Sequence, residues 1–404
     1  MNHQVRSGLA AIAFAAVAGI GAVAFRSAPS PSPSRVAAPL TVHEWGTITT
    51  VHAPNGRPSG CLNQISSSEP LPDFVHKFEP AGLKTPTGSG EANSPGALSR
   101  IPLVKTWTGP CRPDVTMRLE TPVIYFHPGP GGAESVPPLD VTVHFRGGVL
   151  NEFYPNASAS VSVDVEQSDT RAHPLMLRAD AGQPWGGGPL DSSIIGKLRW
   201  TGVSLRDTTP LPQTSAHVWL APRQVQAASL RTSAGEGERY LFYRGVAHLD
   251  AVLGTRRDAA SIRLFAPAQL DWVRRSTSTI AGAWLVDIRV NGTAAFHSIA
   301  PITLSRGAPS IELASVPLFK SDEYQSNAIT ELRAVMKRSL VMAGLADDEA
   351  AAMLETWSNS YFRTPGLRLF YLVPRDWTDY FLPLDISVPS TITRVLVGRI
   401  DLTS

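Results

Sequence analysis

The sequence predicts a mainly β fold, either a β-sandwich or a barrel-like sheet, with a small C-terminal α/β unit; it is α+β overall. Along 41–320, short segments alternate apolar and polar residues, as in Val141–Arg146 and Val161–Glu166. This period of two is typical of strands with one buried face. Glycine (32) and proline (34) separate these segments as turns. After residue 320 the apolar spacing becomes helical, so we divide the chain into a β-rich domain, 41–320, and a C-terminal unit, 321–404.

The first 40 residues are predicted to be an export leader and not part of the fold. Arg6 precedes an apolar stretch, Leu9–Phe25, and small residues follow, so 1–28 has the pattern of a cleaved signal peptide. Residues 29–40 form a Pro/Ser tether. The alternative is an uncleaved anchor, although the stretch is short for a membrane span. We therefore expect a periplasmic or extracellular protein, which contacts a membrane only if the leader is uncleaved.

The composition excludes several classes of protein. Hydrophobic residues make up 43% of the chain, enough for a core, and no long apolar run follows the leader to suggest a multi-pass membrane protein. Lys and Arg number 36 and Asp and Glu 34, but Arg6 and Arg26 belong to the leader. The mature chain is therefore neutral, and nothing steers it toward nucleic acid.

The two cysteines, Cys61 and Cys111, predict one disulfide, because an exported protein with an even number of cysteines usually pairs them. They flank most of a loop-rich insertion, 53–113, which has only short apolar runs. Closing this loop would remove roughly 4 kcal/mol of unfolded-state entropy. The alternative is that the two cysteines bind a metal ion. This alternative is weaker, because the two thiols are far apart in the sequence and belong to no paired metal-binding motif.

The first strand of the β-rich domain begins at Thr41, and Asn291-Gly292 is a hairpin turn signal. Seven further segments are predicted as strands: Met117–His127, Lys197–Leu205, His217–Ala221, Arg239–Arg244, Ser261–Phe265, Ala283–Val290 and Ala295–Leu304.

The C-terminal unit is predicted to contain two helices followed by strands. Apolar residues recur at helical spacing from Ile329 to Leu340, and Gly344 follows as a C-cap. Asp347 or Asp348 caps a second helix, whose apolar stripe extends to Tyr361. The predicted strands are Leu367–Val373, Leu384–Val388 and Thr393–Ile400.

Strong catalytic signatures are missing: we find no zinc-protease helix, nucleophile elbow, Walker loop, dinucleotide fingerprint, EF-hand or haem motif. No motif requires a cofactor, and a divalent metal is compatible with the histidines. His43 and Glu44 are catalytic candidates, with His43 as metal ligand or general base. Successive strand residues point to opposite faces, so the two could share a pocket only through a bulge, which Gly46 permits. The alternative is a buried His43–Trp45 pair that ties the strand to the core.

His127 ends a predicted strand and is a second, weak metal-ligand candidate, or else a solvated strand end. Arg244 and His248 form another set, in which Arg244 would bind a carboxylate or phosphate and His248 would be catalytic. The alternative there is an Arg–Asp pair that pins a turn, with Asp250 as the acid.

A last set follows a buried strand. Tyr371, Arg375 and Trp377 are binding candidates for a polar ligand such as a sugar or a peptide, and Asp379 is a catalytic candidate. A capped turn or short helix with Trp377 packed inward is equally consistent with the pattern.

Five landmarks then suggest a family. They are T-V-H-E-W-G-T (Thr41–Thr47), E-T-P-V-I-Y-F (Glu120–Phe126), L-F-Y-R-G-V (Leu241–Val246), G-L-R-L-F-Y-L-V-P-R (Gly366–Arg375) and R-V-L-V-G-R (Arg394–Arg399). In this order they resemble an uncharacterised family of exported bacterial proteins, over nearly the whole mature chain. The resemblance implies export from a bacterium and no particular activity.

Two functions remain open. The first is a binding or envelope-associated module whose partner is a polysaccharide, a peptide or another envelope component. The alternative is an extracytoplasmic hydrolase, metal-dependent or carboxylate-based, that uses His43 or Glu44 with His127, His248 or Asp379. Convergence of these residues and Arg244 on one cleft favours the hydrolase, and scatter favours the module.

Overall fold

The computed structural model describes residues 40–64, 70–78, 80, 112–164, 183–184 and 189–404. Within these ranges the protein is mainly β with a small α part, which confirms the predicted fold class. The predicted leader, nearly all of the tether, much of the insertion and Cys111 lie outside the described residues, so the disulfide stays a prediction.

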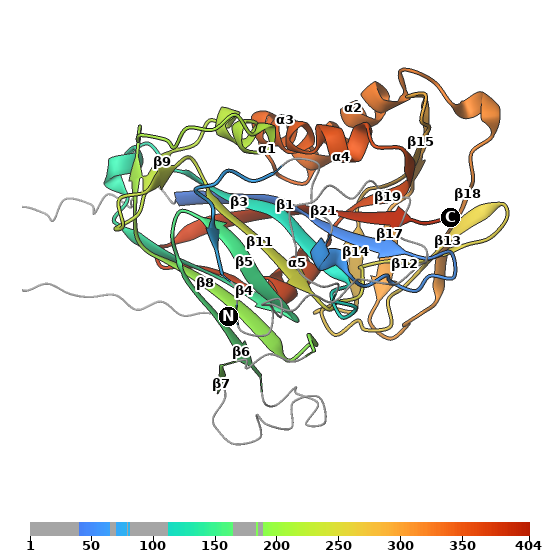
Figure 1. The fold of residues 1–404 in the computed structure, drawn as a ribbon, viewed down its shortest axis with the longest axis horizontal. Coiled ribbons are helices and arrows are strands. Elements are labelled where there is room, and N and C mark those ends of the chain that lie inside the picture. Colours follow the sequence, from blue (N-terminus) through green and yellow to red (C-terminus); the bar gives the residue numbers. More distant parts are fainter. Residues whose placement is uncertain (1–39, 65–69, 79, 81–111, 165–182, 185–188) are drawn as a thin grey trace, which may run out of the picture. The chain divides into compact units, whose positions relative to one another are not determined.

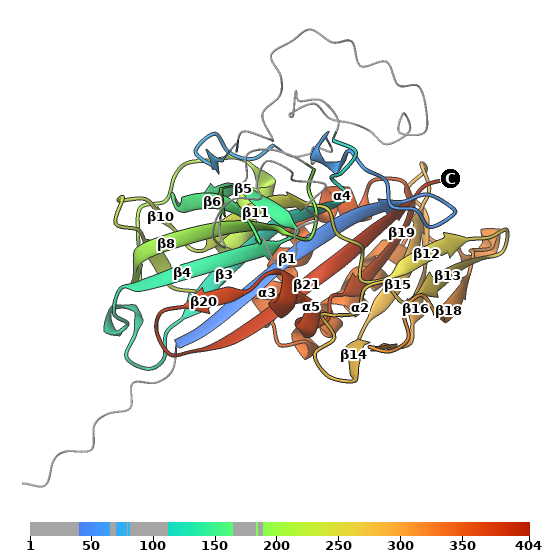
Figure 2. The ribbon, with the colours of Figure 1, turned by 90° about the horizontal axis from the view of Figure 1, so that it is seen from below.

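One large mixed sheet organises this part of the chain (Figures 1 and 2). Its main path runs β10-β9-β8-β5-β11-β3-β1-β21-β19-β15-β16. In chain order these strands are β1 (Leu40–His52), β3 (Met117–His127), β5 (Gly148–Tyr154), β8 (Ile194–Arg206), β9 (Ser229–Arg231), β10 (Gly237–Glu238), β11 (Leu241–Ala247), β15 (Ala283–Ile288), β16 (Ala294–Ile299), β19 (Gly366–Leu372) and β21 (Ser390–Leu402).

Other strands branch from this path or form small sheets. The branches are β2 (His76–Lys77), β4 (Leu139–Arg146), β6 (Ser158–Val163), β7 (Gln183–Pro184) and β20 (Leu384–Ile386). A three-stranded sheet contains β12 (Gly254–Arg257), β13 (Ser261–Phe265) and β18 (Glu312–Pro317), and a two-stranded sheet contains β14 (Thr277–Ile280) and β17 (Ile302–Ser305).

Five α-helices and four 3-10 turns complete the described elements. The helices are α1 (His217–Leu220), α2 (Ala328–Met342), α3 (Asp347–Thr356), α4 (Ser358–Phe362) and α5 (Arg375–Phe381). The 3-10 turns are η1 (Leu62–Gln64), η2 (Ala133–Ser135), η3 (Pro222–Gln224) and η4 (Ser321–Glu323). No helix among the described residues is long and apolar enough to cross a membrane.

Helices α1 to α4 cover one face of the large sheet (Figure 1). Strand side chains such as Trp45, Tyr125 and Phe370 pack there against helix residues such as Met336 and Met353. The opposite face belongs to a second and larger apolar cluster, which includes α5 residue Trp377. We call these the helix face and the inner face.

Strand β1 lies between β3, to which it is antiparallel, and β21, to which it is parallel over its full length. Its register with β3 shifts between Trp45 and Thr47. A Cβ on Gly46 would lie 2.8 Å from Pro122 Cα, so the close approach at this bulge requires glycine. Because the bulge follows Glu44, it does not bring Glu44 to the face of His43.

The predicted C-terminal unit, 321–404, contributes directly to the large sheet. Strands β19 and β21 lie between β1 and β15 in the main path. Helix α2 ends before Gly344, whose φ of 114° is the conformation expected of a glycine after a helix. The predicted second helix is interrupted at Trp357, between α3 and α4.

Two predicted strands are wrong. His217–Ala221 contains helix α1, because a short apolar run does not distinguish a buried helix turn from a buried strand, and Pro222 lacks the N–H for a ladder. Ala295–Leu304 is divided into β16 and β17, and Pro301 lies at the break.

Candidate functional site

Two of the predicted site residues, His43 and His127, meet on the helix face. The antiparallel register places Thr41 opposite His127 and His43 opposite Tyr125, so the two histidines are diagonal neighbours. Their ring centroids are 4.9 Å apart. This pair was predicted as weak metal ligands from the sequence, and strand pairing brings them together.

The third member of the cluster is Glu349, in the first turn of α3. Its Oε2 lies 2.7 Å from His43 Nδ1 and its Oε1 lies 3.0 Å from His127 Nε2. The Ala346 backbone N–H also donates to Oε2, at 2.8 Å. The Glu349 side chain is 0% exposed, whereas those of His43 and His127 are 15% and 25% exposed.

The Glu349 carboxylate is ionised at neutral pH. Burial alone would raise its pKa, but hydrogen bonds from His127, His43 and the Ala346 N–H lower the pKa of Glu349 to about 2. A buried anion beside two imidazoles is therefore the electrostatic character of this cluster.

The spacing of the three side chains suits a metal ion. One ligand atom from each of His43, His127 and Glu349 lies within 4.8 Å of the other two. In a tetrahedral zinc site, with Zn–N distances of about 2.0–2.1 Å, ligand atoms are about 3.3 Å apart. Small movements of the two partly exposed histidines, with a change of tautomer that frees His43 Nδ1 and His127 Nε2 as lone pairs, would therefore close the cluster around one ion.

The sequence does not predict Glu349 as a member of this cluster. It lies 306 residues from His43, and its neighbours Asp347 and Asp348 made the acidic run look like an ordinary helix start. One local signal does single out Glu349: it is the third residue of the helix, where a glutamate side chain commonly accepts a hydrogen bond from the backbone N–H just before the helix. Asp348 holds this turn in place by accepting the Gln226 backbone N–H at 2.8 Å.

Glu44 lies on the inner face, away from His43. Its carboxylate is fully buried and accepts hydrogen bonds from Arg394 Nε and the Tyr243 hydroxyl. Arg394 also contacts Asp379, with Nη1 3.2 Å from Oδ1. The structure thus brings two predicted catalytic residues, Glu44 and Asp379, to one arginine.

Three predicted binding residues lie near this network or in the core. Arg375 donates to Asp379 Oδ2 at 2.7 Å, within α5. Trp377 is 1% exposed and packs inward from the same helix. Tyr371 is also 1% exposed, and its ring covers Gly398, where a Cβ would lie 2.0 Å from the ring.

The remaining two candidates lie apart from both clusters. Arg244 is buried on the helix face, with Nη1 3.4 Å from Glu152 Oε2. The His248 ring is exposed and hydrogen-bonds the Asp114 carbonyl at 2.8 Å. The predicted residues therefore do not converge on one cleft, and this scatter favours the binding module over a hydrolase that uses all of them. Among the described residues, the group with metal-ligand spacing is His43, His127 and Glu349.

No family model matches the sequence, and no curated protein matches it. Among solved structures, the chain is similar to the mu-homology domain of Fcho1 from Danio rerio with bound Eps15 peptide, with a TM-score of 0.28 and 9% identity, covering 91% of this chain and 96% of that chain. It is also similar to a yeast delta-COP-I mu-homology domain complexed with a Dsl1 WxWxV peptide, with a TM-score of 0.25 and 8% identity, covering 90% and 96%.

Proposed function

We propose that this exported protein binds a divalent transition-metal ion, with zinc as the expected metal, through His43, His127 and Glu349. The observation that supports it is the set of three ligand atoms within 4.8 Å of one another. Two imidazole nitrogens and one carboxylate oxygen are a ligand set that zinc accepts. The buried Glu349 carboxylate supplies the negative charge that a cation needs in a partly desolvated position.

Among the described residues the cluster offers three ligands, and this count favours a reactive metal over a purely structural one. Structural zinc sites have four protein ligands, whereas catalytic sites have three and leave one position for water. Here the histidines reach solvent and the carboxylate is buried, so the fourth position would face outward. A metal in this position would lower the pKa of a bound water and polarise a substrate carbonyl, so the proposed reaction class is hydrolysis.

We expect the purified protein to bind one Zn²⁺ per chain in equilibrium dialysis. His43→Ala and Glu349→Ala should each weaken binding by at least about 100-fold, because each removes a ligand. The loaded protein should also hydrolyse at least one ester or peptide of a chromogenic panel.

His76→Ala is the matched control. His76 Nε2 lies 2.8 Å from the Glu236 carboxylate, so it forms a His–Glu pair like that of the candidate site but without a second histidine. This variant should bind Zn²⁺ like wild type. Absence of stoichiometric zinc, or equal affinity in His43→Ala, would contradict the metal site. Equal rates of hydrolysis in zinc-loaded and chelator-treated protein would contradict the proposed hydrolytic role of the metal, while the metal-binding site itself would stand.

A peptide-binding module is the second candidate, and a groove between β16 and β18 favours it. The groove, of about 560 Å³, is lined by residues 296–300 and 314–317. In the part of the chain that the structure describes, both strands end their sheets, so each has an edge that pairs with no further strand of its sheet. On β16 the backbone N–H and C=O of Ala294 point away from β15 and pair with Gln325. Because the direction of these groups alternates along a strand, the backbone N–H and C=O of Phe296 and Ser298 also point away from β15.

An extended peptide that adds to the edge of β16 should lose affinity by at least about tenfold in Ser298→Pro, which removes an outward N–H without touching the ladder to β15. The measurement is selection from a random peptide library, followed by titration of the selected peptide. Ser298→Ala keeps the N–H and should bind like wild type. Equal binding by the proline variant would exclude strand addition at this edge.

A further inference from the structure

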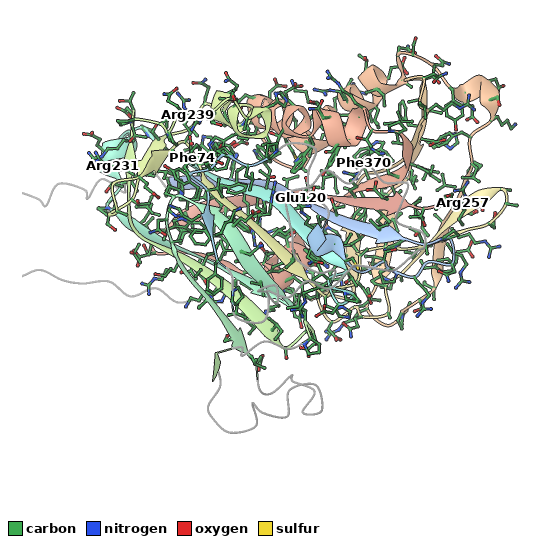
Figure 3. The ribbon with its side chains drawn as sticks, in the orientation of Figure 1. Phe74, Glu120, Arg231, Arg239, Arg257 and Phe370 are labelled. Carbon is green, nitrogen blue, oxygen red and sulfur yellow. The ribbon has the colours of Figure 1, made fainter. Side chains whose placement is uncertain are left out.

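A row of charged side chains crosses the helix face of the large sheet, away from the candidate metal site. Arg118 and Glu120 belong to β3, and Arg244 belongs to the adjacent β11 (Figure 3 labels Glu120). Arg118 is 8% and Arg244 5% exposed. Because Arg118 is opposite Thr49, six residues along β1 from His43, the row lies about 20 Å from His43.

The two arginines are incompletely paired. Arg118 Nε lies 3.4 Å from Glu120 Oε1, and Arg244 Nη1 lies 3.4 Å from Glu152 Oε2. These distances exceed the 2.7–2.9 Å or so of a charge-assisted hydrogen bond. In contrast, the nearby Arg399 donates to both carboxylate oxygens of Asp401, at 3.0 and 2.7 Å.

Several buried donors in this row have no acceptor. Arg118 Nη1 and both Nε and Nη2 of Arg244 are buried without a hydrogen-bond partner. The hydroxyl of Thr121, the residue after Glu120, is also buried without a hydrogen-bond partner. Burial of unpaired donors on charged groups is strongly unfavourable, so these N–H groups require an acceptor.

The local electrostatics also disfavour the charge on Arg118. Burial, followed by the charges of Arg244 and Arg399, lowers the pKa of Arg118, and the opposing effect of Glu120 and Glu152 does not restore it. An added anion would therefore stabilise the protonated guanidinium as well as accept its N–H groups.

We propose that Arg118 and Arg244 together bind a small oxyanion, a carboxylate or phosphate group, on the helix face over the paired strands β3 and β11. Three unpaired N–H positions on two guanidinium groups match the several acceptor oxygens of such a group. This site is separate from the proposed metal centre and does not depend on it.

The test is isothermal titration of the full protein with inorganic phosphate in one arm and acetate in the other, at constant ionic strength. We expect saturable binding of one ion in at least one arm, and that arm identifies the preferred oxyanion. Arg118→Gln and Arg244→Gln should each weaken this binding by at least about tenfold. Arg263→Gln is the control, because Arg263 is 47% exposed and pairs with surface acids.

A second measurement needs no variant and so does not depend on whether the glutamine variants fold. The bound probe should raise the thermal midpoint of wild type relative to chloride at equal ionic strength. No saturable binding in either arm, with no change of midpoint, would overturn the proposal. So would equal binding by wild type and folded Arg118→Gln and Arg244→Gln proteins.

Discussion

Replacing Arg394 with methionine is expected to lower the free energy of unfolding by about 3–5 kcal/mol. The Arg394 side chain is 1% exposed, and it pairs on the inner face with the Glu44 side chain, which is 0% exposed. Without the guanidinium, the Glu44 carboxylate would remain buried with the Tyr243 hydroxyl as its donor. An uncompensated buried charge accounts for the size of the effect, and denaturant unfolding of the purified variant measures it.

The pKa shifts in this pair point the same way. Burial by itself lowers the pKa of Arg394, but the Glu44 carboxylate raises it above its ordinary value. Burial, and then Glu44, raises the pKa of Tyr243, so its hydroxyl remains a donor to the carboxylate. The pair joins β1 to β21 beside His43, and it therefore fixes the strand that carries a candidate metal ligand.

Two variants control this prediction. In Glu44→Leu/Arg394→Met both charges are gone, and most of the lost stability should return, because an apolar pair needs no desolvation of charge. Arg375→Met removes a 44% exposed partner of Asp379 and should cost less than about 1 kcal/mol. A loss below about 1 kcal/mol in Arg394→Met would show that the buried pair does not contribute as described.

Acidification from pH 6.5 to pH 4 is expected to remove up to about 3 kcal/mol of stability through His52 alone. His52 is 3% exposed at the end of β1, and burial lowers its pKa from 6.5 to about 4. In this window the unfolded chain binds a proton that the folded protein does not, so stability falls as the pH falls. Above pH 6.5 both states are neutral at this residue, and its contribution is complete.

The measurement is the free energy of unfolding of wild type and His52→Gln at several pH values. The variant should show a flatter profile between pH 6.5 and 4, since glutamine retains hydrogen-bonding capacity toward Thr255 without titrating. Carboxylates titrate equally in both proteins, so the difference between the profiles isolates His52. Parallel profiles would contradict a depressed pKa.

Much of the fold could be predicted from periodicity. The bounds of Met117–His127 and Ser261–Phe265 agree with β3 and β13, and the apolar spacing from Ile329 to Leu340 locates α2. Errors occurred where an apolar run was too short to have a measurable period, as at α1, or where proline interrupted a long run, as between β16 and β17.

The candidate site was only half predictable. His43 and His127 are candidates from the sequence because histidine is a metal ligand and each lies on a strand, but their contact depends on the β1–β3 register. Glu349 was missed because no local pattern relates a residue at the start of α3 to β1. The chemistry of Glu44 makes it a candidate, whereas no local pattern points to its partner Arg394, 350 residues away.

The alternation of side chains along a strand is a local property of the backbone, so the sequence was sufficient to place His43 and Glu44 on opposite faces. Which strands become neighbours is a different matter, because it depends on how apolar faces from the whole chain are buried together. That packing places α3 on the helix face and brings the Glu349 carboxylate to two histidines from β1 and β3. The sequence by itself therefore determines which side chains of a strand share a face. The cluster of His43, His127 and Glu349 exists because distant segments of the chain pack into one core.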